Sequence, residues 1–340
     1  MLASGCARET ADRGPTEKPS ARPLMPSPRD ILRLARPGDW TKNSFVLLAF
    51  VFWLANTNPP HTPEQVSAKL TAALVAFASF CLVASGFYSI NDAIDAEKDR
   101  GHPVKCRRPV ASGAISQRAA VVIGVILVSA AIAAAASVSK ALAATVIAYA
   151  LLQVAYNARL KRVAFIDVMT IATGFALRAG AGALAIEVQV SVWLLLCVFF
   201  LCMYLGFIKR MCDLVSAERA GSAWKSPAGY RGREEIQWLL GVSAVITTIA
   251  YLSYTMSDHT WKIFGARATG LALLTPLVLA AIHRFWRRAN EGSSDSPLDA
   301  LRSDPVVFAT ITIYGALLGV VLFVPAAKDM LERVFLQHYG

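Results

Sequence analysis

Long apolar runs alternate with short polar segments along most of the chain. In nine of these runs the length is close to that of a helix that crosses a membrane, which is about 20 residues. They lie at about 43–56, 68–90, 118–138, 140–156, 163–186, 191–208, 235–256, 264–283 and 306–325. The first is short, and Trp40 and Lys42 before it suit an anchor at the membrane surface. The pattern predicts an all-α fold: a polytopic membrane helix bundle of about nine transmembrane helices.

Composition supports a membrane as the solvent of this chain. Hydrophobic residues make up 55% of the sequence and charged residues 17%, a balance that is too apolar for a soluble domain. The six cysteines show no CxxC pairing, so neither a disulfide framework nor a zinc site is indicated. Residues 1–28 are rich in Pro, Ser and Arg and predict a disordered cytosolic tail. Residues 29–340 are expected to form a single transmembrane catalytic domain.

The formal net charge of +11 fits either nucleic acid or an anionic membrane as a partner. Most Lys and Arg residues fall before the first run and in every second segment between runs, as the positive-inside rule requires for a cytoplasmic amino terminus. The charge therefore reflects topology, and no nucleic-acid partner is expected. We expect a multi-pass protein of the cell inner membrane, with its polar site on the cytoplasmic side.

An acidic sequence ends the second run. Asp92, Asp95 and Asp99 follow Asn91 and lie at i, i+3 and i+7, on one face if the helix continues. Stacked carboxylates repel one another, and a divalent cation removes that penalty. Mg²⁺ takes one or two carboxylates together with phosphate oxygens, so the array predicts a site for Mg²⁺ and a diphosphate. The alternative is a solvated helix end that helps to set topology.

Basic residues follow the acidic face directly. The loop contains Arg100, His102, Lys105, Arg107 and Arg108. Acidic and basic groups in succession are typical of a site that holds metal and phosphate together. Ordinary positive-inside charge is the alternative, and it suffices for Arg100 alone.

Two further cytoplasmic loops repeat this composition. One carries Tyr156 and Lys161 and leads to Asp167; the other carries Lys209, Arg210 and Asp213 and is followed by Tyr230. Within the next run, Arg178 shares a helix face with Asp167 and lies about 16 Å deeper at about 1.5 Å per residue. A charge at that depth is normally paired or lines a wet cavity, and a purely structural ion pair remains possible.

The chain resembles the UbiA-type intramembrane prenyltransferase superfamily, whose NDxxDxxxD motif matches Asn91, Asp92, Asp95 and Asp99. Within it, residues 36–43 are similar to the RPxxWxKN of the decaprenyl-phosphate phosphoribosyltransferases. The HPxK-RP loop, the Tyr156-Asn157 turn, the Gly174 to Arg178 helix and Lys209-Arg210 agree as well. Asp213 stands where that branch usually has Glu. The second DxxxD motif of aromatic prenylating enzymes is not found, which argues against aromatic prenylation.

This resemblance implies transfer of 5-phosphoribose from phosphoribosyl diphosphate to a polyprenyl phosphate lipid. The alternative is a prenyltransferase with an isoprenyl diphosphate donor and an aromatic or isoprenoid acceptor. A transporter would gather its polar groups at mid-membrane, and here they gather at one face. A homo-oligomer is possible.

The candidate site follows from these patterns. Asp92, Asp95 and Asp99 are expected to bind Mg²⁺ and act in catalysis with Asp213. Substrate binding is expected from Lys42, Asn91, Lys105, Arg107, Arg108, Tyr156, Lys161, Asp167, Arg178, Lys209, Arg210 and Tyr230.

Overall fold

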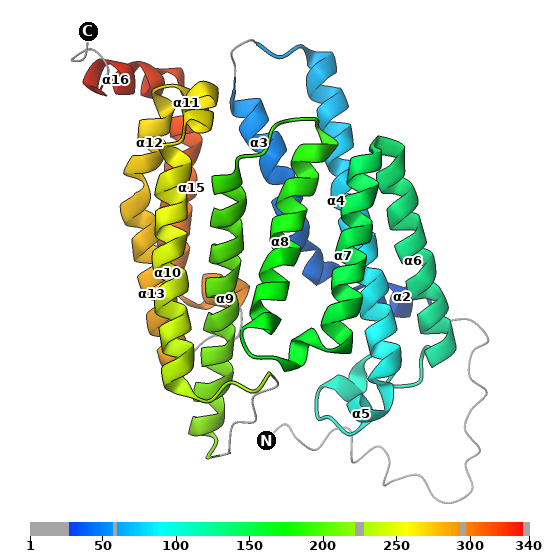
Figure 1. Ribbon diagram of the computed structural model, residues 1–340. Helices are drawn as coiled ribbons and strands as arrows, with labels where there is room; N and C mark the ends of the chain where they lie inside the picture. The colour runs from blue at the N-terminus through cyan, green and yellow to red at the C-terminus, as the bar shows by residue number, and fades with distance from the viewer. Residues whose placement is uncertain (1–26, 57–59, 222–227, 293–296, 336–340) are drawn as a thin grey trace, which may run out of the picture. The chain divides into compact units, whose positions relative to one another are not determined.

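The computed structural model describes residues 27–56, 60–221, 228–292 and 297–335 (Figure 1). Within these ranges every regular element is a helix, which confirms the all-α prediction. In chain order the α-helices and 3₁₀ helices (η) are α2 Pro28–Ala35, η1 Pro37–Leu47, α3 Leu48–Ala55, α4 Pro63–Ile94, α5 Ala96–Arg100, η2 Lys105–Arg107, α6 Gln117–Val138, α7 Lys140–Ala158, η3 Leu160–Arg162, α8 Ile166–Ala185, α9 Val192–Arg219, α10 Arg233–Thr255, α11 Asp258–Phe264, α12 Arg267–Leu273, α13 Thr275–Asn290, α14 Pro297–Ser303, α15 Pro305–Phe323 and α16 Pro325–Phe335.

Eight helical segments of the described chain are long and apolar enough to cross a membrane. They are α4, α6, α7, α8, α9, α10, the α12–α13 segment and α15. The first expected span is instead divided between the 3₁₀ helix η1 and the eight-residue α3. A 3₁₀ helix rises about 2.0 Å per residue against about 1.5 Å in an α-helix, so such a segment covers a given distance with fewer residues. Nearly all of the expected tail at 1–28 lies outside the described residues.

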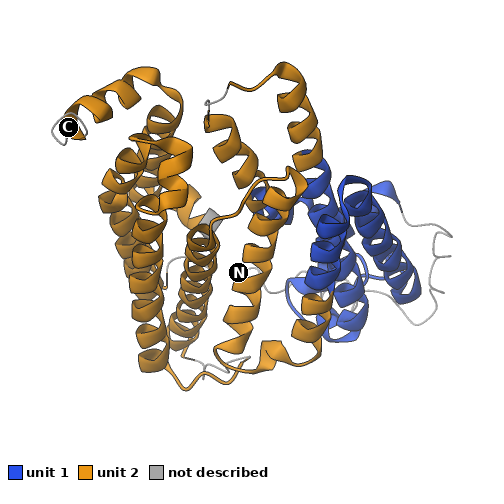
Figure 2. Ribbon diagram, turned by 45° about the horizontal axis from the view of Figure 1, so that its top comes forward, with its two compact units in different colours: residues 1–44, 74–150 blue, residues 45–73, 151–340 orange. Residues whose placement is uncertain are grey.

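The chain divides into two compact units (Figure 2). Unit 1 comprises residues 1–44 and 74–150, and unit 2 comprises residues 45–73 and 151–340. The single catalytic domain expected over residues 29–340 stays a prediction.

In unit 1, the amino-terminal segment is tied to α4 by side-chain hydrogen bonds. The indole N–H of Trp40 donates to Ser85 Oγ at 3.1 Å, and Ser85 Oγ donates to the Ala35 carbonyl at 2.7 Å. One helical turn before Ser85, Cys81 Sγ accepts a hydrogen bond from Asn43 at 3.2 Å. These contacts fix the residue between them, Arg36, beside the carboxyl-terminal end of α4.

Close helix packing in unit 1 depends on small residues. A Cβ atom at Gly86 of α4 would lie 2.7 Å from the Gly124 carbonyl oxygen of α6, and one at Gly124 would lie 2.6 Å from Ile90. Helices in membranes approach closely where such residues meet, because packing, rather than the hydrophobic effect, drives their association. This contact lies just before the acidic end of α4 and holds it firmly.

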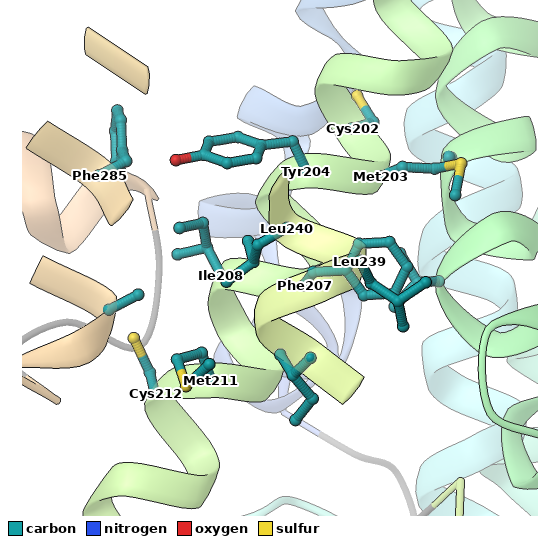
Figure 3. Close-up of a cluster of buried hydrophobic side chains, with 14 of the residues drawn as sticks. Cys202, Met203, Tyr204, Phe207, Ile208, Met211, Cys212, Leu239, Leu240 and Phe285 are labelled. Carbon is teal, nitrogen blue, oxygen red and sulfur yellow. The ribbon is translucent and has the colours of Figure 1, made fainter. Parts of the chain in front are cut away.

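Unit 2 has its core between α9 and α10 (Figure 3). Tyr204, Phe207 and Met211 of α9 are almost fully buried, as is Leu240 of α10. Helix α8 packs on the same α9, because Gly206 leaves room for Val168, whose Cγ1 would be 2.6 Å from an added Cβ. The amino-terminal end of α8, where Asp167 lies, is thereby held against α9.

Candidate functional site

The acidic motif of unit 1 does not lie on one uninterrupted helix. Helix α4 ends at Ile94 and α5 begins at Ala96. The Asp95 backbone between them has ψ −1°, against about −42° in a regular helix. Backbone hydrogen bonds still run from Asp95 to Asn91 and from Asp99 to Asp95, both at 2.9 Å. The chain therefore bends at Asp95 without separating Asp92 from Asp99.

Asp92 and Asp99 are buried carboxylates that share arginine partners. Asp92 is 2% exposed and Asp99 4% exposed. The Arg108 Nη1 atom lies 3.3 Å from Asp92 Oδ1 and 2.6 Å from Asp99 Oδ2. A second guanidinium, that of Arg36, reaches Asp92 Oδ1 at 2.5 Å. The four groups form one compact cluster of two negative and two positive charges.

Arg36 belongs to this cluster, although the candidate site predicted from the sequence does not include it. It follows α2 in the left-handed conformation, with φ 51°, a region that non-glycine residues seldom adopt. Its guanidinium carbon also lies 4.8 Å from the centre of the Tyr88 ring, a cation–π arrangement. The only sequence signal for it was its place at the start of the RPxxWxKN-like segment.

The other predicted residues of unit 1 are more open to solvent. Asn91 and Asp95 are partly exposed, and Lys105 and Arg107 of η2 are exposed. Lys42, also exposed, makes an ion pair with Asp39 at 2.5 Å. Of the predicted residues in unit 1, the structure thus brings Asp92, Asp99 and Arg108 into direct contact.

Unit 2 contains a further buried carboxylate, that of Asp167, and its set of donors is complete. Asp167 is 0% exposed. Its Oδ1 accepts hydrogen bonds from the Val168 N–H and the Tyr230 hydroxyl. Its Oδ2 accepts from Arg210 Nε at 3.0 Å and lies 2.9 Å from Arg210 Nη2. A carboxylate has about four acceptor positions, and these donors use all of them.

Tyr230 joins this network to the start of α8. Its hydroxyl accepts a hydrogen bond from the backbone N–H of Phe165 at 3.0 Å, where Phe165 has φ 68°. Burial raises the pKa of the Tyr230 phenol far above its ordinary value of 10.0, and the hydrogen bond to Asp167 raises it further. Tyr230 is therefore a neutral donor at every physiological pH.

Arg210 links the closed network to groups that are more accessible. Its Nη1 lies 3.4 Å from Asp213 Oδ2, and its side chain also hydrogen-bonds Tyr156. Asp213 and Tyr156 are partly exposed, as is Lys161, and Lys209 is exposed.

Arg178 lies in the interior of α8 and is 7% exposed. Its Nη1 donates to the Gly174 carbonyl at 2.9 Å, and its guanidinium carbon lies 5.1 Å from the centre of the Phe175 ring. These contacts satisfy part of the buried charge from within its own helix.

The acid cluster of unit 1 fits Mg²⁺, with two carboxylates as ligands of the metal ion. Among the described residues, no three His, Cys, Asp or Glu side chains are grouped as they would be around a metal ion. Asp92 and Asp99 nevertheless converge on a single cationic atom, Arg108 Nη1. Since Mg²⁺ is commonly held by one or two carboxylates plus water and phosphate oxygens, two such groups suffice.

Unit 2 also contains a partly open apolar cavity of about 510 Å³. Side chains of α3, α9, α10, α13 and α15 line it, including those of Phe52, Leu201, Val278 and Ile311. Its walls are hydrocarbon and aromatic, with tyrosine and threonine hydroxyls as the main polar groups. Such a cavity suits an isoprenoid or acyl chain and does not suit a charged solute.

The chain is similar in sequence to proteins named decaprenyl-phosphate phosphoribosyltransferase. It is 31% identical over 234 residues to a decaprenyl-phosphate phosphoribosyltransferase of Mycolicibacterium smegmatis, covering 69% of this chain and 72% of that protein. It is 28% identical over 279 residues to the protein of the same name from Mycobacterium tuberculosis, covering 82% of this chain and 89% of the relative.

The fold matches a solved structure of a UbiA homolog from Archaeoglobus fulgidus bound to GPP and Mg²⁺. The TM-score is 0.61 at 21% identity, over 90% of this chain and all of the other. Together with the eight candidate spans, these matches define a multi-pass membrane enzyme. The sequence model of the UbiA prenyltransferase family matches residues 44–303, and the chain belongs to that family.

Proposed function

We propose that this protein transfers 5-phosphoribose from phosphoribosyl diphosphate to a polyprenyl phosphate. The bond between the anomeric carbon and the diphosphate oxygen breaks, a lipid phosphate oxygen forms the new bond to that carbon, and diphosphate leaves. A phosphate oxyanion needs no general base, because it is already ionised. The observation that carries the proposal is the cluster of Asp92, Asp99 and Arg108, which suits Mg²⁺ and a diphosphate. The similarity to proteins named decaprenyl-phosphate phosphoribosyltransferase supports the choice of donor and acceptor.

The acid cluster of unit 1 is the proposed diphosphate site. Asp92 and Asp99 would hold Mg²⁺, with Asp95 at the bend as a further acidic group and Asn91 beside it. The metal ion, when bound, neutralises charge on the leaving diphosphate. The exposed Lys105 and Arg107 follow on η2 and would meet the phosphate groups of donor or lipid.

The network of unit 2 has a different role in this proposal. Because the acceptor positions of Asp167 are filled, this carboxylate orients Arg210 and does not itself bind substrate. The Tyr230 hydroxyl is likewise engaged, since it donates a hydrogen bond to Asp167 and accepts one from the Phe165 N–H. Asp213 and Tyr156 remain accessible beside Arg210, and Asp213 is suited to accept hydrogen bonds from ribose hydroxyls.

Two features support a lipid acceptor reached from the membrane. The apolar cavity of unit 2 offers a place for part of an isoprenoid chain. The predicted site residues, Arg178 apart, lie at or near the ends of membrane helices, in segments that the charge distribution assigns to the cytoplasm. The proposed location is the cell inner membrane, with the site on its cytoplasmic face.

The test is a product analysis with the purified full-length protein in detergent. Polyprenyl phosphate is incubated with isotope-labelled phosphoribosyl diphosphate and Mg²⁺. The molecular mass of the extracted lipid is then determined by mass spectrometry. The expected product is the lipid phosphate carrying one labelled phosphoribosyl group. If lipid remains unmodified while an isoprenyl diphosphate is consumed with a prenyl acceptor, the protein is a prenyltransferase and the proposal is wrong.

A further inference from the structure

We propose that Arg36 and Arg108 make Mg²⁺ and diphosphate bind cooperatively, because these arginines hold the same carboxylate oxygens that the metal ion needs. The inference rests on the proposed diphosphate site. It concerns the energetic coupling of the two ligands at that site, and it assigns the coupling to two named side chains.

The first step is competition for oxygen atoms. Asp92 Oδ1 is in contact with Arg36 Nη2 and Arg108 Nη1, and Asp99 Oδ2 is in contact with the same Arg108 Nη1. Mg²⁺ binds carboxylate oxygens at about 2.0–2.1 Å. A guanidinium therefore has to move away from an oxygen that becomes a metal ligand.

The second step concerns charge. Two carboxylates and two guanidiniums sum to zero, so the cluster is already neutral. A divalent cation that binds alone displaces the guanidiniums of Arg36 and Arg108 from the carboxylates, and both remain close to the metal ion. Like charges at short range repel strongly when they are only partly solvated, so this state is unfavourable. A diphosphate arriving with the metal reverses this, since its oxygens accept charge-assisted hydrogen bonds from the displaced guanidiniums.

The third step is that the arginines are free to make this exchange and the carboxylates are not. The Arg36 and Arg108 side chains are 26% and 29% exposed, whereas those of Asp92 and Asp99 are 2% and 5% exposed. The guanidiniums can thus turn toward a ligand on their exposed side while the buried carboxylates stay in place. Each ligand then raises the affinity of the other by the same factor.

The experiment compares three titrations of the full-length protein in detergent by calorimetry: Mg²⁺ alone, inorganic diphosphate alone in chelator, and the preformed Mg²⁺–diphosphate complex. For the wild type we expect the complex to bind about tenfold or more tighter than either component alone, which lies within the usual range of coupling. For Arg36→Gln we expect opposite shifts, with Mg²⁺ alone binding about tenfold tighter and the complex binding about tenfold weaker.

Arg33→Gln is the matched control, because it removes the same charge three residues earlier. The Arg33 side chain is 58% exposed and lies 4.0 Å from Asp30. All three affinities should stay at the wild-type values. If Arg36→Gln fails to fold, Arg108→Gln is titrated in its place, with the same opposite shifts expected.

The proposal is overturned if Arg36→Gln lowers the affinity both for Mg²⁺ alone and for the Mg²⁺–diphosphate complex, as a purely structural loss would. It is also overturned if the affinity for Mg²⁺ alone stays unchanged. Inorganic diphosphate is released by both enzyme reactions considered for this protein. A failure of phosphoribosyl transfer therefore leaves this test intact, and a failure of coupling leaves the transfer reaction intact.

Discussion

Two buried aspartates, one in each unit, show how similar charges are used differently. Asp92 of unit 1 is held by Arg36 and Arg108, whose side chains remain about a quarter exposed. Asp167 of unit 2 is held by Arg210, whose side chain is 13% exposed, and by donors that fill its remaining positions. We propose that the first arrangement exchanges partners when ligands bind, whereas the donors to Asp167 already fill its acceptor positions. Both aspartates are buried, so burial does not distinguish them. The difference is that the arginines paired with Asp92 are exposed enough to reach a ligand, whereas the arginine paired with Asp167 is held in place.

The largest expected effect tests the exchangeable side of the comparison. Asp92→Asn keeps the shape of the side chain and removes a proposed metal ligand, so we expect turnover to fall by about 10³-fold. The arginines it releases reach solvent, so thermal unfolding should change little. Turnover and unfolding temperature are measured in the same preparation. Glu97→Gln, which removes an exposed charge in the same motif, is the control and should retain activity.

Asp167→Asn is the corresponding change in unit 2, and its expected effect is on stability. Removing one member of a buried ion pair leaves the other charge uncompensated, at a cost of about 3 kcal/mol in the free energy of unfolding. Unfolding in a denaturing detergent, followed by circular dichroism, gives this value. Equal stability losses in Asp167→Asn and Asp92→Asn would remove the distinction between the two sites.

A smaller loss is expected from Tyr230→Phe, which keeps the ring against Phe207 and deletes one hydroxyl. The lost hydrogen bond to a charged group costs about 1.5–3 kcal/mol. Because the folded pKa of Tyr230 is raised above 10.0, its contribution is fully present below that pH and declines only as pH rises further. The stability difference from wild type should thus be flat between about pH 6 and pH 9, as measured by unfolding at each pH. A difference that changes within that window contradicts the network.

The smallest effect is expected from Lys105→Gln, because Lys105 is exposed and its charge is screened. The Michaelis constants for donor and lipid phosphate should rise by about fivefold at most, since an exposed charge contributes up to about 1 kcal/mol. Arg108→Gln should raise one of these constants at least tenfold, because that side chain makes charge-assisted contacts inside the acid cluster. Similar constants for both variants would make these residues determinants of topology only.

The sequence predicted the helices well and the contacts only in part. Apolar runs fix where membrane helices form, because length and composition are local properties. The bend at Asp95 was not predicted, since nothing in the motif interrupts helical periodicity. Arg36 was missed because it meets Asp92 from 56 positions away, and such a contact depends on how the amino-terminal segment packs on α4.

The contact between Asp167 and Tyr230, on which we base their proposed role in orienting Arg210, was also not predictable from the sequence. Their residue types suggested substrate binding, but 63 positions separate them and their contact is internal. Whether a polar side chain faces a ligand or another side chain is decided by packing. A pattern of residue types does not contain that information.

The most direct test of the proposed function is a competition between donors. The full-length protein receives polyprenyl phosphate, an aromatic and an isoprenoid prenyl acceptor, Mg²⁺, and equal concentrations of labelled phosphoribosyl diphosphate and labelled long-chain isoprenyl diphosphate. All lipid products are identified by mass. The account predicts phosphoribosylated lipid as the product, absent with Asp92→Asn and present with Glu97→Gln. Transfer of the isoprenyl group to an acceptor, with phosphoribosyl diphosphate left intact, would contradict it.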